Sequence, residues 1–409
     1  MFSNVLGPLI YMNKCYRILL LLSIGLRVAA QDTTDLWLKA KSNPNLGRHK
    51  FLELKLHAGV HLYEGDELKN ALDNGYKALE VRMGWMSTGR QTWQRVFNYP
   101  SYGIGFYTGD IGNPSVLGKP NGLYGFFFAP VHRRPKNHFE IGVSLGITYD
   151  LKTYNATTNP TNDAISSKTD VYFNLTFSGI RRLSPSLDLI YGLDLTHYSN
   201  GRMHMPNLGL NMAGPHIGIR YHYNTIRSIV RQQIDSTFEV PRRPTYIPMP
   251  IPPVKHTQEI SLYGAVGMVQ LPKDEGIQAT YFTSSLVFDY YYRISHKSSI
   301  GGGVDGFYDG SLGYVYEKKY GTVKMSDKML MGLHLGYMLH IQKFAVILDP
   351  GLHVIRKDNE KSLFFARVAV RYKFGRYGFV QIGLKTVDGF VADWVEWGGG
   401  GRYMWQNRK

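Results

Sequence analysis

The clearest pattern in the chain is an alternation of apolar and polar positions with a period of two. At the odd positions of 139–149 stand Phe, Ile, Val, Leu, Ile and Tyr, whereas the even positions carry Glu, Gly, Ser, Gly and Thr. Similar runs occur at 217–223, 329–341 and 364–374. Successive side chains of a strand point to opposite faces, so the pattern predicts strands with one apolar and one polar face.

The polar positions of these runs favour a membrane barrel. They repeatedly carry glycine, histidine and arginine, as the wet interior of a transmembrane barrel does. The inner face of a water-soluble sandwich would instead pack on a partner sheet. We therefore predict an all-β fold, a transmembrane antiparallel β-barrel of about 14 strands (roughly 12 to 16) between Phe51 and Trp405.

The N-terminus has the pattern of a signal peptide. Lys14 and Arg17 precede the apolar run 18–26, and small residues follow up to Ala30. The run is shorter than the ~20 residues of a membrane-spanning helix, which argues against an anchor. We expect a signal peptide at 1–30, a short leader at 31–50 and a single outer-membrane barrel at 51–409.

One segment cannot belong to the interior of a sheet. Residues 241–254 are rich in proline, so 225–256 is predicted to be a long loop. The sequence Ser184-Pro185-Ser186 predicts a tight periplasmic turn, and counting strands from it places 225–256 on the periplasmic side. Periplasmic connections of such barrels are normally short, and the sequence offers no reason for this exception.

Charge and cysteine content narrow the class of partner. Cys15 is the only cysteine and lies within the predicted signal, so no disulfide framework is expected in the mature chain. The formal net charge is +16. Export argues against nucleic acid and leaves two interpretations: attraction to a phosphorylated glycolipid, or basic residues that simply occupy rims and a polar lumen.

Candidate chemistry lies in the stretch 187–200. In a strand, His197 and Ser199 share a face with Leu193 and Leu195, whereas Asp194 points to the other face. A serine hydroxyl becomes a good nucleophile when a neighbouring imidazole accepts its proton. The pattern thus indicates a base and a nucleophile at the end of an apolar stripe.

The segment His197-Tyr198-Ser199-Asn200-Gly201, followed by Pro206-Asn207-Leu208-Gly209-Leu210-Asn211, resembles the signature of the lipid A 3-O-deacylase (PagL-like) and acyloxyacyl hydrolase family. Its members are outer-membrane barrels of Gram-negative bacteria. The resemblance implies an ester hydrolase that removes an acyl chain from lipid A on the lipid-facing wall. It assigns Ser199 as nucleophile, His197 as base, and the Asn200 amide with the Gly201 N–H as oxyanion donors.

The third member of the site departs from the family. A glutamate usually orients the histidine, and the matching position is Asn211. An amide oxygen holds the imidazole tautomer but supplies no full charge to the imidazolium. The resemblance further implies lipid A, or lipopolysaccharide, as partner, with Arg202 attracting its phosphates; no metal or organic cofactor is expected, and the oligomeric state is not predicted.

A non-catalytic barrel, such as a porin or an assembly or transport protein, is the alternative function. The substitution at Asn211 favours it. If a continuous pore exists, Arg367, Arg371 and Lys373 share the polar face of one strand and predict a preference for anions. The lumen histidines His216 and His222 are interpreted as part of the polar lining rather than as a metal site.

Overall fold

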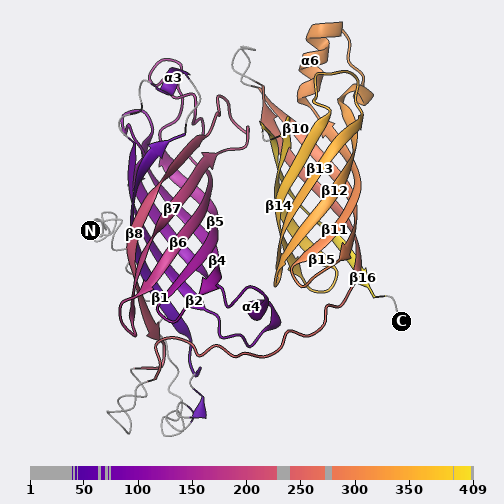
Figure 1. Ribbon diagram of the computed structural model, residues 1–409. Helices are drawn as coiled ribbons and strands as arrows, with labels where there is room; N and C mark the ends of the chain where they lie inside the picture. The colour runs from indigo at the N-terminus through magenta and orange to yellow at the C-terminus, as the bar shows by residue number, and fades with distance from the viewer. Residues whose placement is uncertain are drawn as a thin grey trace, which may run out of the picture. The chain divides into compact units, whose positions relative to one another are not determined.

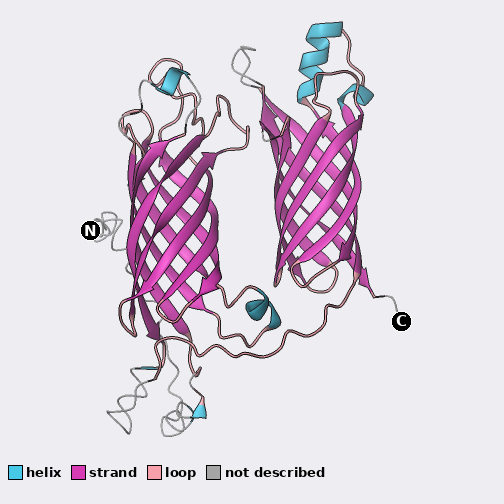
Figure 2. Cartoon of the chain, viewed as in Figure 1, coloured by secondary structure: helices cyan, strands magenta, loops and turns pink. Residues whose placement is uncertain are grey.

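The computed structural model describes residues 45–62, 66–69, 75–227, 240–271, 279–389 and 391–406, with the single positions 39, 42, 43 and 72 (Figure 1). Within them, sixteen antiparallel strands form two closed barrels of eight strands each (Figure 2). The predicted class, an all-β antiparallel barrel protein, is confirmed. The predicted signal peptide lies outside the described residues.

The first barrel contains β1 to β8 in sequence order. The strands are β1 (His49–His61), β2 (Tyr76–Met86), β3 (Ser101–Asp110), β4 (Gly118–Arg133), β5 (Asn137–Leu151), β6 (Asp170–Arg182), β7 (Leu187–Ser199) and β8 (Leu210–Asn224). Two short helices, α3 (Asp66–Lys69) and α4 (Thr92–Val96), lie in its connections. The barrel closes where β8 pairs with β1, with His216 opposite His57.

The second barrel contains the remaining eight strands and closes where β16 pairs with β9. Its strands are β9 (Gln258–Gln270), β10 (Thr280–Arg293), β11 (Ser298–Asp309), β12 (Met329–Ile341), β13 (Phe344–Ile355), β14 (Phe364–Phe374), β15 (Gly378–Val387) and β16 (Val391–Trp405). Between β11 and β12 lie α6 (Ser311–Tyr320) and η2 (Met325–Lys328). Among the described residues, no helix is long and apolar enough to cross a membrane.

The expectation of a single barrel over 51–409 is therefore wrong, although sixteen strands fall within the predicted range. Alternation tells which face a side chain occupies, but it does not tell which strand pairs back to the first. Sixteen strands fit one wide barrel or two narrow ones equally well.

Two barrels also explain the long connection at 225–256, which joins β8 to β9. Residues 240–256 of this connection contain no strand and contact the first barrel at the end where β6 turns into β7. Arg243 forms an ion pair with Asp188 at 2.7 Å, and the Tyr246 hydroxyl accepts a hydrogen bond from Arg133 at 2.7 Å. The segment is a linker between barrels rather than a loop within one.

The inward and outward faces agree with the alternation in the sequence. Leu193 and Ile217 on the outer wall are 59% and 55% exposed, whereas Asp194 and Arg220 are buried in the interior. An eight-stranded barrel is just wide enough for its own side chains to fill it. Arg367 and Arg371 illustrate this in the second barrel, since both are buried. They pair with Glu396 at 2.6 Å and with Asp289 at 3.3 Å, respectively.

Candidate functional site

The candidate site lies on the outer face of the first barrel, where β7 ends and β8 begins. His197 and Asn211 are directly opposite each other in the β7–β8 ladder. The imidazole Nδ1 lies 2.7 Å from the Asn211 Oδ1. An amide oxygen only accepts hydrogen bonds, so Nδ1 carries the proton and donates it. The Nε2 atom is thereby left as the unprotonated nitrogen that a general base requires.

Ser199 follows two residues after His197 on the same face. Its Oγ accepts hydrogen bonds from the Gly201 backbone N–H at 3.1 Å and from the Asn207 Nδ2 at 3.0 Å. Within the described part of the chain, no hydrogen bond joins Ser199 to His197. The serine oxygen therefore rests in a small cradle of two N–H donors, beside a histidine in the tautomer of a base.

Gly209 places the backbone close to both side chains. A Cβ at this position would lie 3.1 Å from the His197 Cε1 and 3.6 Å from the Ser199 Cβ. The φ angle of Gly209 is +74°, in the left-handed region that glycine adopts without strain. The imidazole and the serine thus flank one glycine, and its missing side chain leaves their common space open.

The connection between β7 and β8 is held by the connection between β5 and β6. The N–H groups of Leu208 and Gly209 donate to the carbonyls of Asp163 and Ala164, both at 3.2 Å. Asn162, which is buried, organises that second connection: its Nδ2 donates to the Lys152 carbonyl at 2.9 Å. A short polar side chain that bonds nearby backbone stabilises such turns, so the site rests on two interlocked loops.

The structure differs from the expectation at Asn200. Its side chain is fully buried on the inner side, and its Oδ1 accepts a hydrogen bond from the His204 N–H at 3.3 Å. The strand stays regular through Ser199 and turns only at Gly201, whose φ is +63°. The Asn200 amide therefore does not reach the Ser199 hydroxyl.

Asn207 occupies the place expected of Asn200. Sequence reasoning named its motif without giving this residue a role. The signal was present, because a second asparagine opens the Pro-Asn-Leu-Gly-Leu-Asn run. Only the folded turn shows that the chain returns at Asn207, eight residues on, and brings the amide to the serine.

The surroundings of the site are apolar on one side and polar on the other. Phe173 on β6 lies opposite His197, and Leu195 continues the outer stripe away from the turn; both are exposed. Arg202 lies in the turn itself, with a φ of +70°. Groups of side chains that could hold a metal occur among the described residues, but none of them includes His197 or Ser199.

Comparison with protein families matches both halves of the chain. Residues 77–220 match the model of lipid A 3-O-deacylase (PagL), and residues 258–407 match that of the acyloxyacyl hydrolase C-terminal domain. Together the two models cover most of the chain. The chain belongs to the PagL family. The first match contains the whole candidate site, and the second covers β9 to β16.

No match was found among curated proteins. Solved structures similar to this chain include a mutant of the Rh. blastica porin, at 10% identity, covering 88% of this chain and 99% of that one with a TM-score of 0.16. Pseudomonas aeruginosa OccK11 (OpdR) has 10% identity, covers 88% and 96%, and has a TM-score of 0.21.

Proposed function

We propose that this chain is an outer-membrane esterase that removes an acyl chain from lipid A, with Ser199 as nucleophile and His197 as general base. One observation carries the proposal: on the outer wall, a serine cradled by N–H donors stands beside a histidine whose Nδ1 is fixed by Asn211 at 2.7 Å. Membership of the PagL family supports the substrate class.

The first chemical step transfers the acyl group to the enzyme. The Ser199 oxygen attacks the ester carbonyl of the lipid while its proton passes to the His197 Nε2. The C=O bond becomes a single bond, and a tetrahedral oxyanion forms. Asn211 keeps the Nδ1 proton in place, so the imidazolium holds one proton on each nitrogen.

The oxyanion requires fixed donors close to the serine. The Gly201 N–H and the Asn207 Nδ2 already lie at 3.1 Å and 3.0 Å from the Ser199 Oγ. The carbonyl oxygen of a bound ester lies next to that atom, so a small shift brings it to the same donors. Donors that are oriented before the charge develops stabilise the transition state most.

The remaining steps restore the enzyme. The imidazolium gives its proton to the sugar oxygen, the ester bond breaks, and the deacylated lipid leaves as an alcohol. Water then attacks the acyl-serine, with His197 again accepting a proton. The intermediate collapses to a free fatty acid, and the proton returns to Ser199.

The position on the wall suits a lipid substrate. An acyl chain lying along the outer face meets Leu195 and Phe173, whereas the polar turn with Arg202 faces the headgroup region. In this proposal the Arg202 guanidinium attracts a lipid A phosphate. The family and the barrel fold together point to the outer membrane of a Gram-negative bacterium.

The interior argues against the porin alternative. Arg367 pairs with Glu396 and Asp305, and Arg371 with Asp289, so these arginines lie within neutralising networks. Lys373 is buried as well, and its Nζ lies 2.9 Å from the His340 Nδ1. The proposed reactive site thus lies on the outer face of the first barrel, whereas the basic residues inside the second barrel are held by ion pairs and close polar contacts.

Mass spectrometry of lipid A tests the proposal. Cells that produce the protein are expected to contain lipid A lighter by one acyl group, and Ser199→Ala is expected to abolish the change. Ser284→Ala is the matched control, because Ser284 is a hydroxyl on the outward face of β10 in the second barrel. Unchanged lipid A with the wild-type chain, or full deacylation by Ser199→Ala, would refute the assignment.

A further inference from the structure

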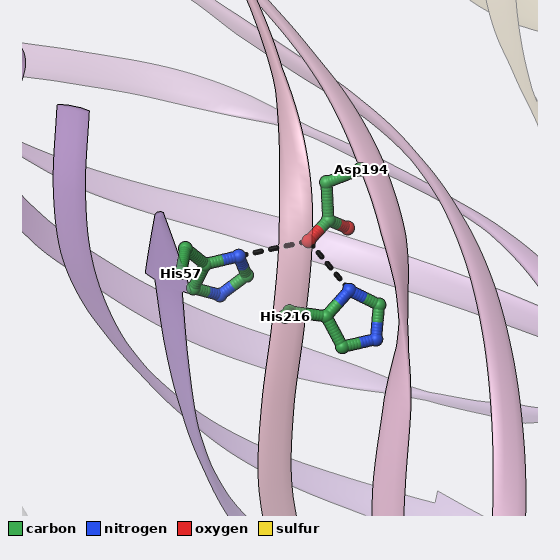
Figure 3. A group of neighbouring side chains, drawn as sticks. All are labelled: His57, Asp194 and His216. Atoms are coloured by element: carbon green, nitrogen blue, oxygen red, sulfur yellow. Dashed lines mark hydrogen bonds and ion pairs between the residues drawn. The ribbon is translucent and has the colours of Figure 1, made fainter. Parts of the chain in front are cut away.

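Three buried side chains converge inside the first barrel (Figure 3). His57 comes from β1, Asp194 from β7 and His216 from β8. The Nδ1 atoms of the two histidines lie 2.8 Å and 2.7 Å from the same oxygen, the Asp194 Oδ2. All three side chains are buried, so this convergence occurs away from solvent.

Each of the three has a partner for its outer atom. The His57 Nε2 lies 3.1 Å from the Glu80 Oε2, and the His216 Nε2 lies 3.0 Å from the Ser178 Oγ. The Asp194 Oδ1 accepts a hydrogen bond from Thr176 at 2.7 Å. Metal-binding histidines typically donate the other ring N–H to a carboxylate or another oxygen in this way. With the protons on Nε2, both Nδ1 lone pairs face the centre of the group.

Hydrogen bonds alone do not fully explain the contacts of the two Nδ1 atoms with the Asp194 Oδ2. The His216 Nδ1 lies 2.7 Å from the Asp194 Oδ2 but is without a partner of hydrogen-bond geometry. His57 has a carboxylate at each nitrogen, and only a protonated imidazole has an N–H for both of them. A cation shared by the two Nδ1 atoms and the Oδ2 satisfies all three at once.

The charges around the group leave room for such a cation. The ion-pair network that includes it has three fixed positive side chains against four carboxylates, namely Lys55, Arg82 and Arg220 against Glu53, Glu80, Glu140 and Asp194. A net negative charge in a buried site is costly unless it is compensated. The shortfall among these fixed charges is one positive charge.

In place of the interpretation of His216 as polar lining, we propose that His57, Asp194 and His216 bind a divalent transition-metal ion of the zinc type. Two imidazole nitrogens and one carboxylate oxygen form a ligand set that Zn²⁺ uses, with a fourth position for a water molecule. The role is structural. The ion joins β1, β7 and β8 where the barrel closes. Its ligand Asp194 lies three residues before His197 on β7.

For the comparable group in the second barrel we propose no metal ion. Asp289, His334 and Asp349 also converge, but they offer one histidine. The carboxylates already have cationic partners, because Arg371 lies 3.3 Å from Asp289 and Arg367 lies 3.5 Å from Asp349. The two groups therefore provide an internal comparison within one chain.

Metal content of the purified full chain tests the inference. Because the ligands are buried, the protein is refolded into detergent micelles with Zn²⁺ or Co²⁺ present, then freed of loose metal by a chelator and gel filtration. We expect about one ion retained per chain, as for a buried site whose ligands assemble on folding. His57→Gln and His216→Gln are each expected to lower the retained metal to background.

Two further variants serve as controls. His222→Gln alters another buried histidine of the same barrel, which pairs with Asp188, and His334→Gln alters the second group. Both are expected to retain the metal. The wild-type Co²⁺ form should show the visible spectrum of a tetrahedral site, and X-ray absorption should show two imidazole ligands.

Several results would overturn the proposal. They are a folded wild-type chain that retains no metal, equal retention in His57→Gln and His222→Gln, or loss of metal only in His334→Gln. The wild-type measurements decide the question even if the glutamine variants fail to fold. Ester hydrolysis is not part of the test, so failure of the metal site and failure of the proposed function are separate results.

Discussion

Replacing Asn211 by aspartate is the sharpest test of the proposed chemistry. Aspartate has the same shape as asparagine, so its carboxylate oxygen can take the place of the Oδ1 that lies 2.7 Å from the His197 Nδ1. The substitution adds one negative charge beside the imidazole with little change in packing. In the proposed mechanism, that charge stabilises the imidazolium formed when Ser199 attacks.

The size of the effect follows from the distance and from the exposure of Asn211. For charges about 4 Å apart, the attraction is about 1 kcal/mol in water and about 4 kcal/mol at an effective dielectric constant of about 20. Asn211 is exposed, which favours the lower part of this range. We take about 2 kcal/mol, which corresponds to a rate increase of about thirtyfold.

The assay measures fatty acid released from lipid A in detergent micelles, with kcat and KM determined separately. The gain is expected in kcat, because the charge acts on an imidazolium that exists only during reaction. Asn211→Ala is the matched control that removes the side chain. It is expected to lower kcat about tenfold, because it removes the acceptor of the hydrogen bond from the His197 Nδ1. Asn211→Glu should also raise activity if its longer side chain fits.

A folded Asn211→Asp chain no more active than Asn211→Ala would refute this reasoning. It would mean that the residue opposite His197 does not act on the base during catalysis. Activity that persists in Asn211→Asp combined with Ser199→Ala would place the reaction at another nucleophile.

The remaining predictions concern the cradle, the turn and the interior. His197→Asn should reduce kcat almost as much as Ser199→Ala, and the double variant should lose no more, because the two act as a unit; additive losses in the kinetics would contradict this. Asn207→Ala should cost about 10²–10³ in kcat if its amide stabilises the oxyanion, and Asn200→Ala much less; a larger loss for Asn200→Ala in the same assay would reverse the two assignments. Gly209→Ala should impair catalysis, because its Cβ would approach the imidazole to 3.1 Å at a positive φ; unchanged kcat would show that the ring has room. The purified chain should show no steady anion-selective conductance in planar bilayers, given the ion pairs of Arg367; a stable pore would restore the porin alternative.

The alternation in the sequence predicted the local structure of the wall well. It placed His197 and Ser199 outward with Leu193, and Asp194 inward, and the structure agrees at each position. This succeeds because the direction of a side chain in a strand depends only on its parity. By the same parity Asn200 falls on the face opposite Ser199, and it is buried in the structure, whereas the resemblance to the family favoured it as a donor.

The sequence could not predict where each sheet closes. Closure depends on which strands pair over long distances, such as His57 with His216 across more than half of the first barrel's sequence. No local pattern records such a pairing. The proline-rich linker was a clue, because a long connection on the side of the short turns is anomalous within one barrel and natural between two.

The role of Asn207 was also beyond local patterns. Its amide reaches the Ser199 hydroxyl because the turn folds back and is fastened to the β5–β6 connection through Asp163 and Ala164. In a turn, the direction of a side chain does not follow from whether its position is odd or even, so alternation does not predict where a donor points. Such a residue becomes visible only when the loops that hold it are known.

The geometry of the site depends on the register between β7 and β8. His197 meets Asn211 because the two residues are direct partners in this ladder, and a slip of one residue would turn every side chain of a strand to the other face. Outer-wall contacts alone fix the register weakly, since membrane lipid accepts any apolar side chain. The interior fixes it more firmly: Asp194, three residues before His197, contacts His216 on the neighbouring β8 and His57 on β1, the strand that follows β8 around the barrel. The geometry of the proposed site on the outer wall is thus set by polar contacts on the opposite face of the same strand, so we expect a change inside the barrel to alter the proposed reaction outside it.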